Sequence, residues 1–72
     1  MVEEIFANRL KTLRTEKSMT QEELAQQIGL TQRKISKLEK LQLMPSPEII
    51  ANIAKFFEVS ADYMLGLSND NI

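Results

Sequence analysis

The chain of 72 residues contains neither cysteine nor histidine. The absence of cysteine excludes disulfide bonds, thiol nucleophiles and cysteine-based zinc sites, and the absence of histidine removes the commonest general base and the other common zinc ligand. We therefore expect no enzymatic activity, no metal site and no other cofactor. A chain of this length has room for one small core. Without a disulfide or a metal, that core must be held by well-packed helices, by oligomerisation, or by both.

Long hydrophobic runs are also missing from the sequence. No apolar run approaches the roughly 18 residues that a membrane-spanning helix needs, and the first residues include Glu3 and Glu4 where a signal peptide would be basic. We therefore expect a soluble, cytoplasmic protein. Apolar residues make up 43% and charged residues 26% of the chain, which is close to the average of folded globular domains.

The net charge is only −1 at pH 7, but the charges are unevenly distributed. Two segments each carry a net charge of +3: residues 9–17, with Arg9, Lys11, Arg14 and Lys17 against Glu16, and residues 32–40, with Arg33, Lys34, Lys37 and Lys40 against Glu39. All other acidic residues lie outside these segments. We expect a molecule with one basic and one acidic face, and binding to a nucleic-acid backbone requires such a basic surface.

Only two glycines and two prolines punctuate the chain, and apolar residues recur at helical spacing between them. The pattern predicts helices over residues 3–17 and 21–28, a third after Thr31, a fourth from Pro47, and a short fifth up to Leu65. The expected helix signals are N-caps at Thr20, Thr31, Ser46 and Ser60, and left-handed stops at Gly29 and Gly66. The predicted fold class is therefore all-α, a compact five-helix domain over residues 1–66 with a polar tail or linker stump at 67–72.

Residues 29–31 separate two short helices by a tight turn, and this is the arrangement of a DNA-binding helix-turn-helix. The second of these helices has an apolar inner side and a basic outer side. Helical geometry places Arg33, Ser36, Lys37 and Lys40 opposite the inward residues Ile35 and Leu38. At its start, Gln32 and Arg33 have side chains suited to the edges of adenine and guanine in the major groove. We expect this helix to read DNA.

The residues of this predicted helix-turn-helix also resemble the motif of a known family. The run TQEELAQQIG at residues 20–29, followed by TQ at 31–32 and ISKLE at 35–39, resembles the Cro/repressor (XRE-type) helix-turn-helix family of phage and bacterial regulators, whose domains have the lambda-repressor-like fold. The similarity continues through PS at 45–46, IA at 53–54, VS at 59–60 and LG at 65–66. It covers the chain from about Phe6 to Gly66.

The resemblance implies roles for individual residues. The residues expected to face base edges are Gln32, Arg33, Ser36 and Lys37. The residues expected to contact phosphates are Gln21, Thr31 and Lys40, with Gln21 also bracing the reading helix. Arg14 and Glu39 match the pair that ties the first helix to the end of the reading helix. One departure concerns the exit from that helix, where this chain has Leu41 in place of the usual glycine.

The function expected from this resemblance is sequence-specific binding of double-stranded DNA by a transcriptional regulator, most simply a repressor. Relatives usually bind palindromic operators as homodimers, and a C-terminal domain absent from this chain is a further expected partner. The alternative is a protein-interaction module or an antitoxin-type partner with the same fold. That alternative would use the apolar connector at residues 41–44, which needs burial in the domain or against a partner.

Overall fold

The computed structural model describes residues 2–69, and within this range the chain forms helices and no strand. The helices are α1 (Val2–Glu16), α2 (Gln21–Ile28), α3 (Gln32–Glu39), α4 (Pro47–Phe57) and α5 (Ala61–Leu65). The all-α, five-helix fold predicted from the sequence is confirmed for this part of the chain. Of the predicted tail at 67–72, residues 70–72 lie outside the described residues. No helix between residues 2 and 69 is long and apolar enough to cross a membrane.

Local hydrogen bonds define where the helices begin and end. The Thr20 hydroxyl accepts from the backbone N–H of Glu23 at 3.0 Å, and the Glu23 carboxylate accepts from the backbone N–H of Thr20 at 2.8 Å. This reciprocal capping box satisfies two of the free donors at the start of α2. The N-caps of the three following helices are Thr31, Ser46 and Ser60, each accepting from the backbone N–H three residues later. The four predicted N-caps are confirmed.

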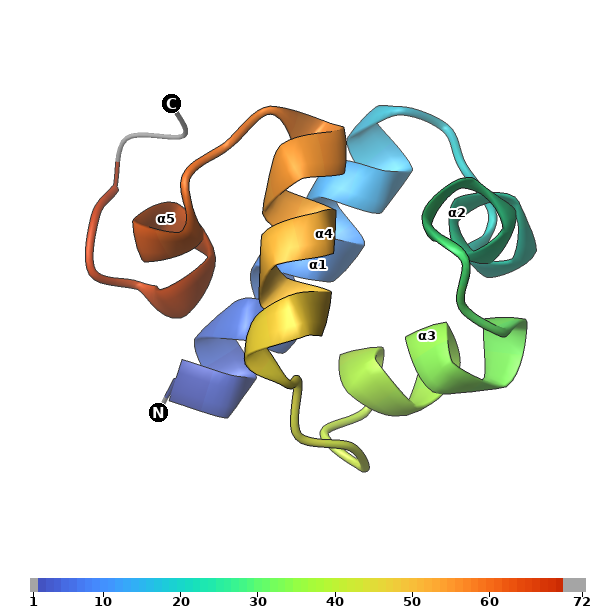
Figure 1. The fold of residues 1–72 in the computed structure, drawn as a ribbon, viewed down its shortest axis with the longest axis horizontal. Coiled ribbons are helices and arrows are strands. Elements are labelled where there is room, and N and C mark those ends of the chain that lie inside the picture. The colour runs from blue at the N-terminus through green and yellow to red at the C-terminus, as the bar shows by residue number, and fades with distance from the viewer. Residues whose placement is uncertain (1, 70–72) are drawn as a thin grey trace.

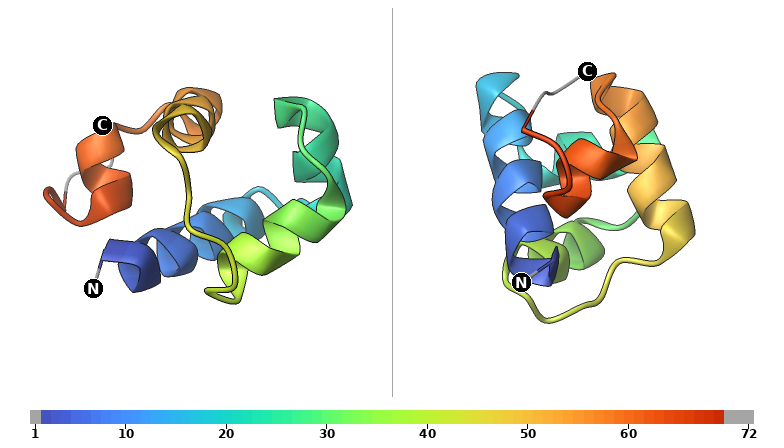
Figure 2. Two further views of the ribbon diagram at one scale, coloured as in Figure 1. Left: turned by 60° about the horizontal axis from the view of Figure 1, so that its bottom comes forward. Right: turned by 90° about the vertical axis from the view of Figure 1, so that its left-hand side faces the viewer.

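The helices pack around one hydrophobic core. Figure 1 shows α5 at one end of the molecule and α2 with α3 at the other, and Figure 2 shows α1 and α4 as two layers between these ends. Every helix contributes to the core, and its buried members are Phe6, Leu10, Leu13, Leu24, Ala25, Ile35, Leu38, Ile53, Ala54, Phe57 and Met64. Ile35 and Leu38, the inward residues predicted for the third helix, are both buried.

The exit from α3 is made by a leucine in the left-handed conformation. Leu41 has φ 62°, a backbone region that costs a residue with a Cβ atom about 1–2 kcal/mol. The backbone N–H of Gln42 donates to the Lys37 carbonyl at 2.8 Å, and that of Leu41 donates to the Leu38 carbonyl at 3.4 Å. These two bonds form the Schellman motif that a glycine usually completes. Leu41 thus ends the helix where the family has glycine, and α3 does not run on.

The connector between α3 and α4 is only partly buried. Leu43 packs against the core, whereas the side chains of Leu41 and Met44 are 50% and 65% exposed. Of the two outcomes left open by the sequence, folding back on the domain applies to Leu43 alone. Leu41 and Met44 leave apolar surface facing solvent.

Candidate nucleic-acid interface

The second helix of the helix-turn-helix lies at an edge of the molecule with one side free (Figure 1). Ile35 and Leu38 of α3 are buried in the core, with exposed fractions of 0% and 1%. Turned away from them are the predicted DNA-contacting residues of α3 and its C-cap: Gln32, Arg33 and Lys40 are exposed, and Ser36 and Lys37 are half-exposed. The folded chain therefore presents these side chains together on one solvent-accessible face.

The side chain of Gln32 is already held by a partner. Its Nε2 donates to Oε1 of Gln21 at 2.7 Å, across the turn between α2 and α3. The amide group of Gln32 keeps its oxygen and one N–H free. The first side chain of α3 is therefore held in position by a hydrogen bond within the domain itself.

Gln21 in turn joins Gln32 to a partly buried ion pair. The Gln21 Nε2 donates to Oε1 of Glu39 at 3.0 Å. The Arg14 guanidinium donates to the two oxygens of Glu39, from Nε to Oε2 at 2.7 Å and from Nη2 to Oε1 at 3.0 Å. It also donates to the backbone carbonyl of Met19 at 2.8 Å. A continuous chain of hydrogen bonds therefore links α1, both ends of α3 and the start of α2.

The Arg14–Glu39 pair is largely shielded from water, with side chains 11% and 4% exposed. The hydrogen bonds and the negative charge of Glu39 raise the pKa of Arg14 above its usual value, while burial opposes the shift. An arginine is protonated throughout the physiological range in any case, so Arg14 keeps its positive charge there.

The residues predicted to contact phosphates occupy different environments. The Thr31 hydroxyl oxygen accepts from the backbone N–H of Lys34 at 3.1 Å, which leaves its proton free to donate. Lys40 is exposed just after α3. Gln21 is half-exposed and already has two side-chain partners.

The first basic segment, residues 9–17, is divided between two structural links. The link through Arg14 was expected from the family resemblance, whereas the link through Arg9 was not. Arg14 belongs to the pair with Glu39. Arg9 points to the opposite end of the domain, where it donates to the carbonyl of Tyr63 and lies over its ring. Because these partners are 54 residues apart in the chain, no local sequence pattern could have indicated the contact. The positive charge of α3 is therefore the main basic surface of the helix-turn-helix.

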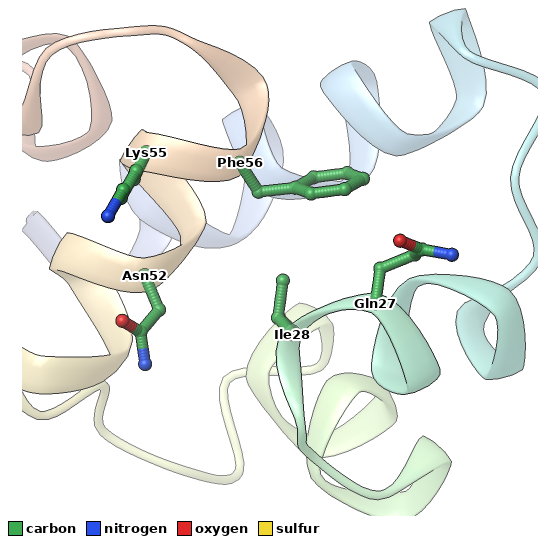
Figure 3. Close-up of a pocket in the computed structure, with 5 residues that line it drawn as sticks. All are labelled: Gln27, Ile28, Asn52, Lys55 and Phe56. Carbon is green, nitrogen blue, oxygen red and sulfur yellow. The ribbon is translucent and has the colours of Figure 1, made fainter.

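A shallow hollow lies between α2 and α4, away from the outer face of α3. Figure 3 shows its lining, which consists of Gln27, Ile28, Asn52, Lys55 and Phe56. Its side chains are mostly neutral, and none belongs to the predicted DNA-contacting set. Within residues 2–69 there is no group of three or more acidic side chains that could hold a metal ion.

A helix-turn-helix whose second helix is exposed and basic defines the class of this protein, and comparison with known families gives the same result. The pattern of the helix-turn-helix family matches residues 10–64. The chain belongs to the XRE-type helix-turn-helix family. The resemblance found in the sequence is thereby confirmed.

Several curated proteins are similar to the chain. It is 42% identical over 60 residues to the HTH-type transcriptional activator BcrR of Enterococcus faecalis, covering 83% of this chain and 29% of that protein. It is 32% identical over 66 residues to the HTH-type transcriptional regulator YobD of Bacillus subtilis, covering 92% of this chain and 59% of that protein. It is 38% identical over 55 residues to the HTH-type transcriptional regulator MJ0272 of Methanocaldococcus jannaschii, covering 76% of this chain and 83% of that protein. The chain thus spans less than two thirds of BcrR and YobD. No solved structure matches it significantly.

Proposed function

We propose that this domain binds double-stranded DNA in a sequence-specific manner and serves a transcriptional regulator, with α3 as the helix that enters the major groove. The observation that supports this most strongly is the outer face of α3, where Arg33 and Lys37 are accessible beside a Gln32 side chain already fixed by Gln21. A major groove about 12 Å wide admits one helix, and the residues at the start of a recognition helix reach the base edges.

The free groups on α3 suit particular bases. Gln32 uses one N–H for Gln21 and retains an oxygen and an N–H, the two groups that pair with the N6 and N7 positions of adenine. The Arg33 guanidinium suits the O6 and N7 acceptors of guanine. Ser36 and Lys37 lie one turn further along the same face and extend the contact to neighbouring bases or phosphates.

Phosphate contacts would fix the orientation of the domain on DNA. Thr31 offers its hydroxyl proton beside the start of α3, and Lys40 offers a positive charge at the other end of the helix. Gln21 has one Nε2 proton left after its bond to Glu39. These donors lie at both ends of α3, so together they would hold it along the groove.

We infer further that the domain acts as a homodimer on a palindromic operator and represses by occupying the promoter. Two half-sites about 34 Å apart would match a two-fold dimer with one α3 in each of two successive major grooves. The relative BcrR is named as an activator, so the direction of regulation needs its own test. A reporter gene with the operator placed over the promoter should fall in expression when the protein is present, and a rise would assign activation.

The binding proposal is tested by selection from a randomised pool of duplex DNA at about 150 mM salt, a concentration that suppresses weak attraction to phosphates. We expect a palindromic motif with two half-sites about one helical turn apart. The double variant Arg33→Ala/Lys37→Ala should lose binding to that motif while its circular dichroism spectrum remains helical.

The matched control is Lys11→Ala/Lys55→Ala, which removes the same charge from exposed lysines outside α3. This control should retain most of the affinity. Equal binding by all three proteins, or equal loss in both double variants, would contradict recognition by α3. Affinity that hardly changes between 50 and 200 mM salt would favour the alternative of a protein-interaction module.

A further inference from the structure

A second surface of the domain has no role in the proposed DNA contact. It is a groove between the start of α1 and the connector from α3 to α4, with a cavity volume of about 330 Å³. Its lining consists of Glu3, Glu4, Leu41, Gln42, Leu43 and Met44. It joins two segments that are distant in sequence and lie close together at the N-terminal end of α1 (Figure 2).

Three of the six residues that line this groove, Leu41, Leu43 and Met44, are apolar. Among residues 2–69 the exposed large hydrophobic side chains are Val2, Leu41, Met44 and Leu67. Leu41 and Met44 line the groove, and Val2 directly precedes the lining residue Glu3. Contiguous exposed apolar surface in a small domain marks an interaction site more often than isolated exposed residues do.

Two of the residues that line the groove, Glu3 and Glu4, are acidic, and we refer to this pair as the acidic rim. Glu3 and Glu4 stand in the first turn of α1, and within residues 2–69 the one ion pair joins Arg14 and Glu39. The two rim carboxylates therefore have no ion-pair partner in the described part of the chain. Lys40, the nearest cation in sequence, is not among the residues that line the groove.

We infer that this groove docks a cationic amphipathic segment of another protein, with large apolar side chains entering between Leu41 and Met44 and with lysine or arginine facing Glu3 and Glu4. The volume lies at the lower end of the range of about 300–1,000 Å³ found for binding pockets, so it suits one or two large side chains. Opposite charges around an apolar centre provide both orientation and selectivity.

A second copy of this chain fits the groove less well. A two-fold dimer through this surface would place the same patch on both subunits, so the Glu3 and Glu4 carboxylates of both copies would be brought into one interface. Like charges across an interface disfavour association. The acidic rim therefore selects a basic partner over self-association.

The inference can be tested with a defined probe, a fluorescein-labelled twelve-residue peptide with leucines on one helical face and lysines on the other. Binding to the full chain is followed by fluorescence anisotropy. A control peptide in which each lysine is replaced by glutamate should bind at least about tenfold more weakly, because it opposes the acidic rim. Raising the salt concentration should weaken binding of the lysine peptide only in part, because salt screens the charges and leaves the apolar contribution to binding.

Matched protein variants locate the binding site. Met44→Ser should weaken peptide binding about tenfold, an effect expected from losing one buried apolar side chain. Leu67→Ser, at a residue 72% exposed outside the groove, should leave binding unchanged. Glu3→Gln/Glu4→Gln should weaken binding, whereas Glu22→Gln/Glu48→Gln removes equal charge from the first turns of α2 and α4 and should not.

Several outcomes would overturn the inference. Equal affinity for the two peptides would remove the role of the acidic rim. Equal effects of Met44→Ser and Leu67→Ser would show that the peptide binds elsewhere. A wild-type dimer that becomes a monomer in Met44→Ser, measured by sedimentation equilibrium, would assign the groove to a second copy. Operator binding by the same variants is measured in parallel. A loss of peptide binding with operator binding retained would show that the groove and the proposed DNA contact act separately.

Discussion

The guanidinium group of Arg9 lies over the ring of Tyr63, 4.1 Å from its centroid, and its Nη1 donates to the backbone carbonyl of the same residue. The same guanidinium donates to the Ser68 carbonyl at 2.8 Å and to the Asn69 side-chain oxygen at 3.2 Å. One cation of α1 therefore holds both α5 and the segment that follows it. Arginine suits this position because its planar fork donates in several directions while it stacks on an aromatic ring.

Replacing Arg9 by alanine should loosen α5 and the following residues. We expect the free energy of unfolding to fall by about 1–3 kcal/mol, since hydrogen bonds from a charged donor are lost. Hydrogen exchange should accelerate most in residues 61–69 and least in α2 and α3. Arg9→Lys should rescue little, because an ammonium group cannot reproduce the fork. The exposed Lys11→Ala serves as the control, and uniform acceleration across the domain would contradict a local role for Arg9.

The Arg14–Glu39 pair gives a second prediction. Arg14→Ala or Glu39→Ala alone should lower the free energy of unfolding by about 2–4 kcal/mol, because each leaves a largely buried charge without its partner. Replacing both residues by methionine should cost less than the sum of the single changes. Urea denaturation of the single and double variants measures the coupling. Additive losses would show that the two residues stabilise the domain independently.

The left-handed Leu41 predicts a stabilising substitution. Leu41→Gly should raise the free energy of unfolding by about 1 kcal/mol, because glycine adopts positive φ without a Cβ clash. Leu41→Ala is the matched control: it removes most of the side chain and keeps the clash, so it should bring no gain. Chemical denaturation distinguishes the two. A gain of equal size in both variants would trace the effect to the exposed side chain instead of the backbone.

The two glycines should differ in their tolerance of alanine. Both have positive φ, 72° for Gly29 and 81° for Gly66, so each substitution carries the same backbone cost. A Cβ atom at Gly29 would meet nothing within 4 Å, whereas one at Gly66 would lie 2.7 Å from Cδ1 of Ile5. Gly66→Ala should therefore lower the melting temperature more than Gly29→Ala. Equal shifts would mean that Ile5 moves aside at no measurable cost.

The proposed DNA contact predicts a change in specificity from a residue of α2. Gln21→Ala removes the acceptor that fixes Gln32 and should cost about 0.5–1.5 kcal/mol in stability. Selection from randomised DNA should then show relaxed preference at the base pair read by Gln32, with the remaining positions retained. Gln26→Ala, an exposed glutamine of the same helix, is the control. Unaltered preference in Gln21→Ala would show that Gln32 needs no bracing.

Local chemistry explains how much of the fold could be predicted. Thr20, Thr31, Ser46 and Ser60 cap helices because their hydroxyl groups reach backbone donors three residues away, and that requirement is visible in any short stretch of sequence. Gly29 likewise marks its own left-handed turn. The ends of α1 differ by one residue from those expected, a shift common at helix termini.

Two features could not be predicted, for different reasons. The end of α3 depends on the left-handed conformation of Leu41. The hydrogen bonds around Leu41 stabilise this conformation, although leucine itself does not favour it. The position of Arg9 depends on packing between chain segments far apart in sequence. For the candidate site, the exposed positions of α3 followed from helical geometry, while the bond between Gln21 and Gln32 required the packed arrangement of both helices.

The hydrogen-bond chain through Arg14, Glu39, Gln21 and Gln32 also limits how specificity can be transplanted. Grafting only the exposed residues of α3 into another scaffold would separate Gln32 from the supports supplied by α1 and α2. A graft that carries Arg14 and Gln21 along with α3 would keep the geometry of the first side chain of α3. Under the proposed DNA contact, the unit that must be transferred is therefore larger than α3 alone.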